Sequence, residues 1–322
     1  MRPAPIQMLS APLPPRLRLA RWLGHQRWIP KGQDFIVRRL CPPDAPPALD
    51  FEVGFYGLRY RGTLANFLDW TVFFYGAYCA AELVLLSHAA RCLRAAGQPV
   101  VYLDVGANVG HHLLFMSKRV DQAYGFEPWR PVFDRAVEKL QLNHCVNARV
   151  FPLALGERNA SLRFFPPCGP NQGTGSLVQS WSAGGNADQG APITVKVSVG
   201  DELIAAEQIG KVGIIKIDVE GYEAAVCRGV AQTLLRCRPF VLLELSPQGV
   251  RELGSAQRLK NSFYPDALIF RLRNRRHSFR LEPYCFGEEL AELFIVPAEQ
   301  GAALERALGR RRWRKWLSQD SI

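Results

Sequence analysis

Short apolar runs alternate with helical stretches over residues 99–300. The apolar runs cover residues 100–104, 123–127, 150–153, 213–218 and 240–244. Runs of this length, bounded by turn residues, are typical of strands that are buried on both faces. Because helical segments separate them, the pattern predicts an α/β domain with a mostly parallel sheet and helices on both faces.

A different pattern precedes this domain. Residues 51–62 alternate between apolar and polar positions and turn at Gly57, which predicts a hairpin. Residues 78–96 carry apolar side chains at helical spacing and stop at Gly97, which predicts a helix. Near the other end, residues 267–281 resemble a second hairpin and residues 291–296 a last strand.

These patterns divide the chain into four segments. We expect a basic, proline-rich N-terminal segment (1–48), a hairpin and helix extension (49–98), the α/β domain (99–300) and a basic C-terminal helix or tail (301–322). The 322 residues are 48 % apolar, which excludes a disordered chain and fits one main domain with appendages. The loop-rich stretch 173–190 is a candidate lid.

The composition of the chain also indicates the cellular compartment of the protein. No apolar run approaches the roughly 18–20 residues of a membrane span, and the first residues lack the apolar core of a signal peptide. The 8 cysteines include no C-x-x-C pair, which favours reduced thiols over zinc ligands or disulfides. We therefore expect a cytoplasmic protein.

The net charge of +11 is concentrated at the two ends of the chain. Basic residues and tryptophans occur together there, at Arg16, Arg18, Arg21, Arg27, Arg38 and Arg39 and again in residues 309–316. Such ends are often simply solvated, but they also suit an anionic membrane surface or a nucleic acid. Peripheral contact with the inner face of a membrane stays open as an interpretation.

Four of the predicted strands finish on an acid. These acids are Asp104, Glu127, Asp218 and Glu244. Each acid alone could cap the following helix or pair with an arginine. Ligands of parallel sheets bind outside the carboxyl ends of the strands, however, so four carboxylates together favour a binding crevice at that edge.

The turn after residue 104 favours a cofactor that contains ribose. Gly106 and Gly110 permit a tight turn around Asn108, and Glu127 follows Gly106 by 21 residues, where a carboxylate can bind ribose hydroxyls. The loop lacks the G-x-G-x-x-G spacing that holds a pyrophosphate. S-adenosylmethionine has ribose and no phosphate, and Asp104 would face its positively charged amino-acid part.

A second unusual stretch is residues 214–230, IIKIDVEGYEAAVCRGV. Lys216, Asp218 and Glu220 follow one another at a spacing of two residues, so they share one face for as long as the strand persists. Three buried ionisable groups must pair with one another. The trio is either a structural ion-pair cluster or a reaction site.

Together these stretches resemble the FkbM family of S-adenosylmethionine-dependent methyltransferases. The resemblance covers about residues 100–250 and rests on the motifs DVGANVG, FEP, ALGE, KIDVEGYE followed by RGV, and LLEL. It implies a class I methyltransferase (Rossmann-like) fold, a seven-stranded sheet with one antiparallel strand. It also implies O-methylation of a hydroxyl on a saccharide, glycan or secondary metabolite.

The resemblance further assigns cofactor-binding residues. Asp104, Gly106, Asn108 and Gly110 would surround the methionine part of S-adenosylmethionine, Glu127 the ribose, and residues 152–156, with Ala154 at their centre, the adenine. Basic residues at the two ends of the chain fall outside the shared pattern.

Removal of the acceptor's proton requires a general base. Asp218 and Glu220 are candidates because a carboxylate beside another acid has a raised pKa. His111 competes for this role, since it and His112 directly follow the cofactor turn at the start of a helix. The clustered acids have oxygen ligands that suit magnesium or calcium, but their spacing gives no metal-binding loop, so we assign no metal site.

Two other functions stay open. A nucleic-acid-modifying methyltransferase agrees with the charge of +11, but residues 218–221 (DVEG) stand where such enzymes carry an Asp/Asn-Pro-Pro-aromatic turn. A non-catalytic binding protein on the same fold would have lost cofactor residues, and here they are intact.

Overall fold

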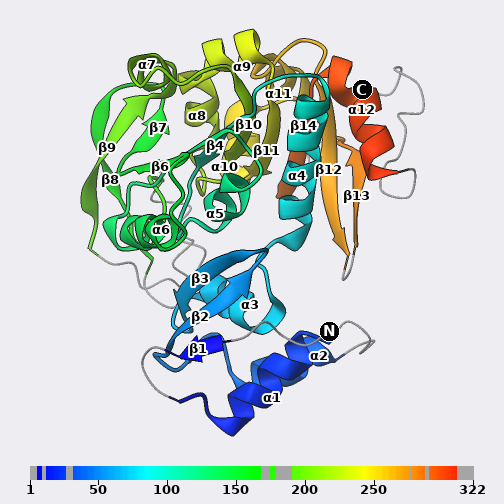
Figure 1. Ribbon diagram of the computed structural model, residues 1–322. Coiled ribbons are helices and arrows are strands. Elements are labelled where there is room, and N and C mark those ends of the chain that lie inside the picture. The colour runs from blue at the N-terminus through cyan, green and yellow to red at the C-terminus, as the bar shows by residue number, and fades with distance from the viewer. Residues whose placement is uncertain are drawn as a thin grey trace.

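The computed structural model describes residues 6–8, 12–26, 32–167, 175–178, 191–275, 278–286 and 290–309. These residues form a large α/β body and a smaller N-terminal module that extends from one end of it (Figure 1). Most of the candidate lid, 173–190, and the basic tail beyond Gly309 lie outside the described residues.

One eight-stranded sheet forms the centre of the body. Its strands are β4 (Val101–Val105), β5 (Gln122–Phe126), β6 (Ala148–Phe151), β10 (Val212–Ile217), β11 (Phe240–Leu245), β12 (Leu268–Arg275), β13 (Ser278–Pro283) and β14 (Ala291–Val296). The order is β13-β12-β14-β11-β10-β4-β5-β6. The strands from β11 to β6 run parallel, and β14 is antiparallel to both of its neighbours.

The predicted α/β fold is confirmed. Each of the five predicted parallel strands lies within two residues of its expected position, because strands buried on both faces are apolar throughout. The expected seven strands are one too few. Both arms of the predicted hairpin at 267–281 join the large sheet, so β13 adds an eighth strand that runs in the same direction as β14.

Helices cover both faces of this sheet (Figure 1). Tyr102 and Ile214 face one core, and their neighbours Leu103 and Ile215 face the other, as the alternation of side chains along a strand requires. The first core is closed by α4 (Ala80–Ala95), α5 (His111–Ser117), α6 (Arg130–Leu142) and α12 (Ala298–Leu308). The second is closed by α7 (Gly200–Ala206), α8 (Glu223–Gly229), α9 (Ala231–Cys237), α10 (Pro247–Leu253) and α11 (Ala256–Asn261).

The N-terminal module contains a small antiparallel sheet and three helices. The elements are β1 (Ile6–Met8), α1 (Pro15–Gly24), α2 (Gln33–Leu40), β2 (Asp50–Phe55), β3 (Leu58–Thr63) and α3 (Phe67–Tyr75). The predicted hairpin is confirmed as β2 and β3, which turn at Gly57. β1 pairs with β2, so strand pairing crosses the segment boundary that we expected at residue 48.

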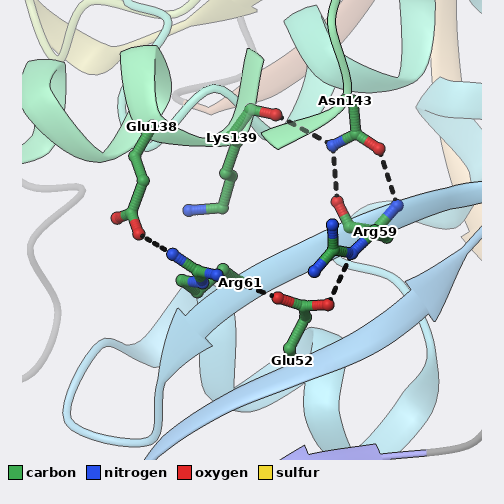
Figure 2. Close-up of polar contacts among 6 residues, drawn as sticks. All are labelled: Glu52, Arg59, Arg61, Glu138, Lys139 and Asn143. Carbon is green, nitrogen blue, oxygen red and sulfur yellow. Dashed lines mark hydrogen bonds and ion pairs between the residues drawn. The ribbon is translucent and has the colours of Figure 1, made fainter. Parts of the chain in front are cut away.

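Charged and amide side chains attach this module to α6 (Figure 2). Glu52 accepts hydrogen bonds from Arg59 (2.6 Å) and Arg61 (3.1 Å), and Arg61 also reaches Glu138 on α6 at 2.7 Å. Asn143, directly after α6, hydrogen-bonds both the backbone N–H and the carbonyl of Arg59. These contacts fix the hairpin against the body.

Asp69 forms a second, buried link between the module and α6. It is fully buried, accepts a hydrogen bond from the Tyr60 hydroxyl at 2.7 Å, and lies 3.6 Å from the ammonium group of Lys139. Lys139 itself is 1 % exposed. A buried charge requires such a partner, so this pair ties α3 to α6.

The connection from α3 to α4 runs from the module into the body. α3 ends at Gly76, and the predicted helix at 78–96 is confirmed as α4. No single helix in the described part of the chain is both long and apolar enough to cross a membrane. Only α3 and α4 taken together reach that length and hydropathy, and they meet at a bend of 83°.

Candidate active site

The turn between β4 and α5 has the tight geometry that its glycines predict. Gly106 has a φ of +81°, and a Cβ at this position would lie 1.8 Å from the backbone oxygen of Asp218. Glycine therefore lets the β4 turn touch the end of β10. Asn108 also has a positive φ, 49°, and its side-chain oxygen accepts a hydrogen bond from the Val109 N–H.

Gly110 has a different neighbour. Its φ is +75°, and an added Cβ would lie 2.8 Å from the Cβ of Ala136 on α6. Glycine is required there for close packing of the turn against α6, whereas the family resemblance places Gly110 beside the methionine part of the cofactor. The cofactor role of Gly110 stays a prediction.

Glu127 follows β5 and is held by the backbone on both sides. One carboxylate oxygen accepts the Asn108 N–H at 2.9 Å, and the other accepts the Trp129 N–H at 2.8 Å. Burial raises the pKa of Glu127 to about 7, although both backbone donors act in the opposite direction. Each oxygen keeps a lone pair that can accept a further hydrogen bond.

A pocket opens beside these residues and encloses about 620 Å³, including space that is open to solvent. This is within the size range of small-molecule sites. Its wall combines apolar side chains with a few polar groups. The lining residues are Val105, Gly106, Asn108, Phe126, Glu127, Pro128, Trp129, Val132, Ala154, Leu155, Phe164, Gly175, Leu177, Asp218, Val219, Glu220 and Tyr222. We call this space the ribose pocket, after the hydroxyl-binding capacity of Glu127.

A small sheet contributes part of this wall. It consists of β7 (Ala154–Gly156), β8 (Ala160–Phe164) and β9 (Ile193–Val199), in the order β7-β9-β8. Ala154 and Leu155 lie in its first strand, so the predicted Ala154 is in the pocket wall.

Lys216 and Asp218 form the predicted ion pair at the end of β10. The Lys216 ammonium lies 2.9 Å from an Asp218 oxygen and 3.8 Å from an Asp104 oxygen. Burial alone would lower the pKa of Lys216, but the two carboxylates raise it. Lys216 in turn lowers the pKa of Asp218 against the effect of burial, so the raised pKa that the sequence predicts for Asp218 beside another acid is wrong. Asp104 is fully buried beside this pair and is absent from the lining of the ribose pocket.

A second, smaller pocket adjoins Asp218. It encloses about 220 Å³, again partly open to solvent, and is lined by Glu82, Lys216, Ile217, Asp218, Leu242, Leu243, Glu244 and Glu292. We call it the acid pocket. Glu244 and Glu292 are directly paired across β11 and β14, and Glu82 comes from the first turn of α4.

Two of the four carboxyl groups in the acid pocket, those of Glu244 and Glu292, have raised pKa values. The charge of Asp218, with burial, raises the pKa of Glu244 to about 11, and Glu244 hydrogen-bonds Asp218. Burial raises the pKa of Glu292 to about 7. The Asn274 side chain donates a hydrogen bond to a Glu292 carboxylate oxygen at 2.8 Å. The interaction between Asp218 and Glu244 therefore favours a single proton shared by this pair at neutral pH.

Glu220 lies in the ribose pocket wall but not on the strand. β10 ends at Ile217, and Glu220 has a left-handed φ of 49°. Glu220 therefore does not share a strand face with Lys216 and Asp218, although the spacing of two residues suggested it. Its backbone oxygen accepts a hydrogen bond from the Ser176 hydroxyl.

His111 is placed away from both pockets. It is 1 % exposed, packs against Phe55 and Tyr60, and its Nε2 lies 3.0 Å from the backbone oxygen of Tyr78. Burial lowers the pKa of His111 well below 6.5. His112 points elsewhere, with its Nε2 3.1 Å from a Glu82 oxygen.

The structure thus brings Gly106, Asn108, Glu127, Ala154, Asp218 and Glu220 to one pocket, and leaves Asp104, Gly110 and His111 outside its wall. Glu82 and Glu292 in the acid pocket were not predicted from the sequence. A polar residue inside the apolar run 291–296 was the signal for Glu292, whereas Glu82 had no distinguishing pattern. Among the described residues, no group of three or more His, Cys, Asp or Glu side chains is arranged to hold a metal ion.

The chain is similar in sequence to known methyltransferases. The Methyltransferase FkbM domain matches residues 104–280. The chain is 30 % identical over 173 residues to the hexuronic acid methyltransferase AglP of Haloferax volcanii, covering 52 % of this chain and 66 % of AglP. It is 28 % identical over 142 residues to Methyltransferase 1 of Beauveria bassiana, covering 40 % of this chain and 57 % of that protein.

The chain therefore spans less than two thirds of the length of either relative. Among solved structures, Methyltransferase FkbM from Methylobacillus flagellatus KT is 16 % identical with a TM-score of 0.41, and the match covers 61 % of this chain and 43 % of that one. The FkbM domain match extends over more than half of the 322 residues, and the chain belongs to the FkbM methyltransferase family.

Proposed function

We propose that this protein transfers a methyl group from S-adenosylmethionine to a hydroxyl of a saccharide. The position of Glu127 is the main support for this proposal. Two backbone N–H groups fix its carboxylate in the wall of a pocket lined mostly by apolar side chains. Membership of the FkbM methyltransferase family supports it.

The ribose pocket fits the proposed cofactor. Glu127 has the remaining capacity to accept ribose hydroxyls, and Trp129, Phe164 and Leu155 give the apolar surface that a purine requires. The pocket also lacks the glycine spacing that holds a pyrophosphate. S-adenosylmethionine supplies an electrophilic methyl group when it is bound.

Asp218 is the residue that we assign as general base. It lines both pockets and is kept ionised by Lys216 at 2.9 Å. A base must reach the hydroxyl proton while the acceptor lies beside the cofactor, and Asp218 stands at that boundary. The buried position of His111 favours a packing role for it.

The acid pocket is the space that we assign to the acceptor. Carboxyl oxygens accept hydrogen bonds from sugar hydroxyls, whereas an anionic group would meet the negative charge of Asp218. We therefore propose an acceptor ring without a carboxylate, which differs from the hexuronic acid in the name of AglP. The same repulsion disfavours a nucleic acid as the acceptor.

The proposal is tested by methyl transfer from radiolabelled S-adenosylmethionine to a panel of methyl glycosides of neutral sugars, amino sugars and uronic acids. We expect transfer to a neutral or amino sugar that is lost in the Asp218→Asn protein. Cofactor binding without transfer to any saccharide, together with transfer to RNA, would contradict the saccharide assignment.

A further inference from the structure

Helices α1 and α2 expose large apolar side chains that a solvated surface does not need. Leu19 is 50 % exposed, Trp22 46 %, Phe35 74 % and Ile36 42 %. The described part of the chain has nine large hydrophobic residues that are exposed in this way, and these four lie on two short helices that pack together. Grouped apolar exposure of this kind marks an interaction surface.

The same two helices are basic on their exposed sides. On α1, Arg18 stands four residues before Trp22, and these two side chains are neighbours on a helix. On α2, Phe35 is followed at three and four residues by Arg38 and Arg39. Asp34 is the one acidic residue of the two helices, and it is paired with Arg38 at 2.8 Å.

The position of the helices leaves this surface accessible. In Figure 1, α1 and α2 lie at the end of the molecule that is farthest from the large sheet. Their inward residues Leu17, Ala20 and Val37 are fully buried, so each helix has one packed side and one exposed side. The contacts with α6 in Figure 2 hold the module to the body.

We propose that the exposed sides of α1 and α2 bind the surface of an anionic lipid bilayer. Arginines attract the lipid headgroups, and the tryptophan, phenylalanine and aliphatic side chains enter the boundary between headgroups and acyl chains. A nucleic acid would use the arginines and could stack on Trp22, but it would leave Leu19 and Ile36 exposed to water. This inference is independent of the methyl-transfer chemistry.

The test is co-sedimentation of the full chain with vesicles of phosphatidylcholine alone or with roughly 30 % phosphatidylglycerol. We expect binding to the anionic vesicles only, and loss of that binding at high salt. Arg18→Glu with Arg39→Glu should weaken it by about thirtyfold or more, equivalent to about 2 kcal/mol. Trp22→Ser with Phe35→Ser should weaken it at least tenfold.

Matched controls use exposed residues elsewhere. Arg236→Glu with Arg306→Glu makes the same change in charge, and Val146→Ser with Leu235→Ser makes a similar change in apolar surface. Circular dichroism verifies that each variant is folded. If Trp22→Ser with Phe35→Ser does not fold, Arg18→Glu with Arg39→Glu still tests membrane binding. Absence of binding to anionic vesicles, equal losses in the controls, or binding to an RNA oligonucleotide instead of vesicles would overturn the proposal.

Discussion

The ribose pocket and the acid pocket meet at Asp218 but are built in opposite ways. The ribose pocket has mostly apolar walls, and its Glu127 is held by two backbone N–H groups. The acid pocket has four carboxyl groups around Lys216, and their mutual repulsion sets which of them are ionised. In the ribose pocket the backbone positions the carboxylate of Glu127. In the acid pocket neighbouring side chains control the ionisation of the carboxyl groups.

This difference separates two kinds of selectivity. Fixed acceptors in an apolar site recognise the shape and hydroxyl pattern of one cofactor. A cluster of carboxyl groups selects against anions and accepts many arrangements of hydroxyls. Substitutions on either side of Asp218 should therefore have separable effects on cofactor affinity and on turnover.

The largest effect is expected at Asp218 itself. Asp218→Asn removes the general base, so turnover should fall by about 10²–10⁴-fold while the affinity for S-adenosylmethionine changes little. Steady-state transfer to the best saccharide of the panel, with calorimetry for the cofactor, measures both. Glu220→Gln is the comparison: if it abolishes turnover and Asp218→Asn does not, the base is Glu220.

Glu127→Ala should act on the other pocket. Charged hydrogen bonds to the ribose hydroxyls are worth about 1.5–3 kcal/mol each, so cofactor affinity should fall at least tenfold. Turnover at saturating cofactor should change less than the affinity does. A folded Glu127→Ala protein with unchanged affinity would exclude Glu127 from the cofactor site.

A smaller effect is expected from Glu292→Gln in the acid pocket. Removal of one carboxyl group weakens the repulsion of anions, so KM for a uronic acid glycoside should fall about threefold to tenfold relative to KM for its neutral counterpart. Glu305→Gln on α12 is the matched control. No change in this ratio would place the acceptor elsewhere.

The smallest effect on turnover is expected at His111, which lies outside both pockets. His111→Phe should leave turnover within about threefold but change the pH dependence of stability. Because folding lowers the pKa of His111, protonation of the unfolded chain below about pH 6.5 destabilises the wild type. Between pH 7.5 and 5.5 the wild type should lose about 1.4 kcal/mol of unfolding free energy relative to the variant, measured by urea titration.

Sequence reasoning located the ribose pocket better than the acid pocket for a physical reason. Gly106, Asn108 and Glu127 are defined by short turns after strands, and local sequence determines such turns. The acid pocket needs β14 to lie beside β11, which brings Glu292 to Glu244 across the sheet. Periodicity predicts that strands exist but not their order, so Glu292 and Glu82 could not be grouped with Asp218.

The same distinction explains His111 and Gly110. Gly110 closes the cofactor turn and His111 follows it. His111 contacts the N-terminal module and Gly110 contacts α6, and both of these elements are distant in sequence from the turn. Their surroundings depend on how the module and the helices pack, which the motif does not encode.

The pH dependence of cofactor binding tests whether Glu127 binds the ribose. Ribose hydroxyls require an ionised Glu127, and with a pKa of about 7 in the free protein roughly one tenth of it is ionised at pH 6 and nine tenths at pH 8. Calorimetry should show that the wild type binds S-adenosylmethionine about tenfold more tightly at pH 8 than at pH 6. Glu223→Gln is the control and should show the same increase, because the carboxyl group of Glu223 has a similar pKa but lies outside the pocket wall. The Glu127→Gln protein should bind S-adenosylmethionine more weakly than the wild type, and its affinity should not increase between pH 6 and pH 8. Equal affinities and equal pH dependence in the wild type and Glu127→Gln would contradict the account.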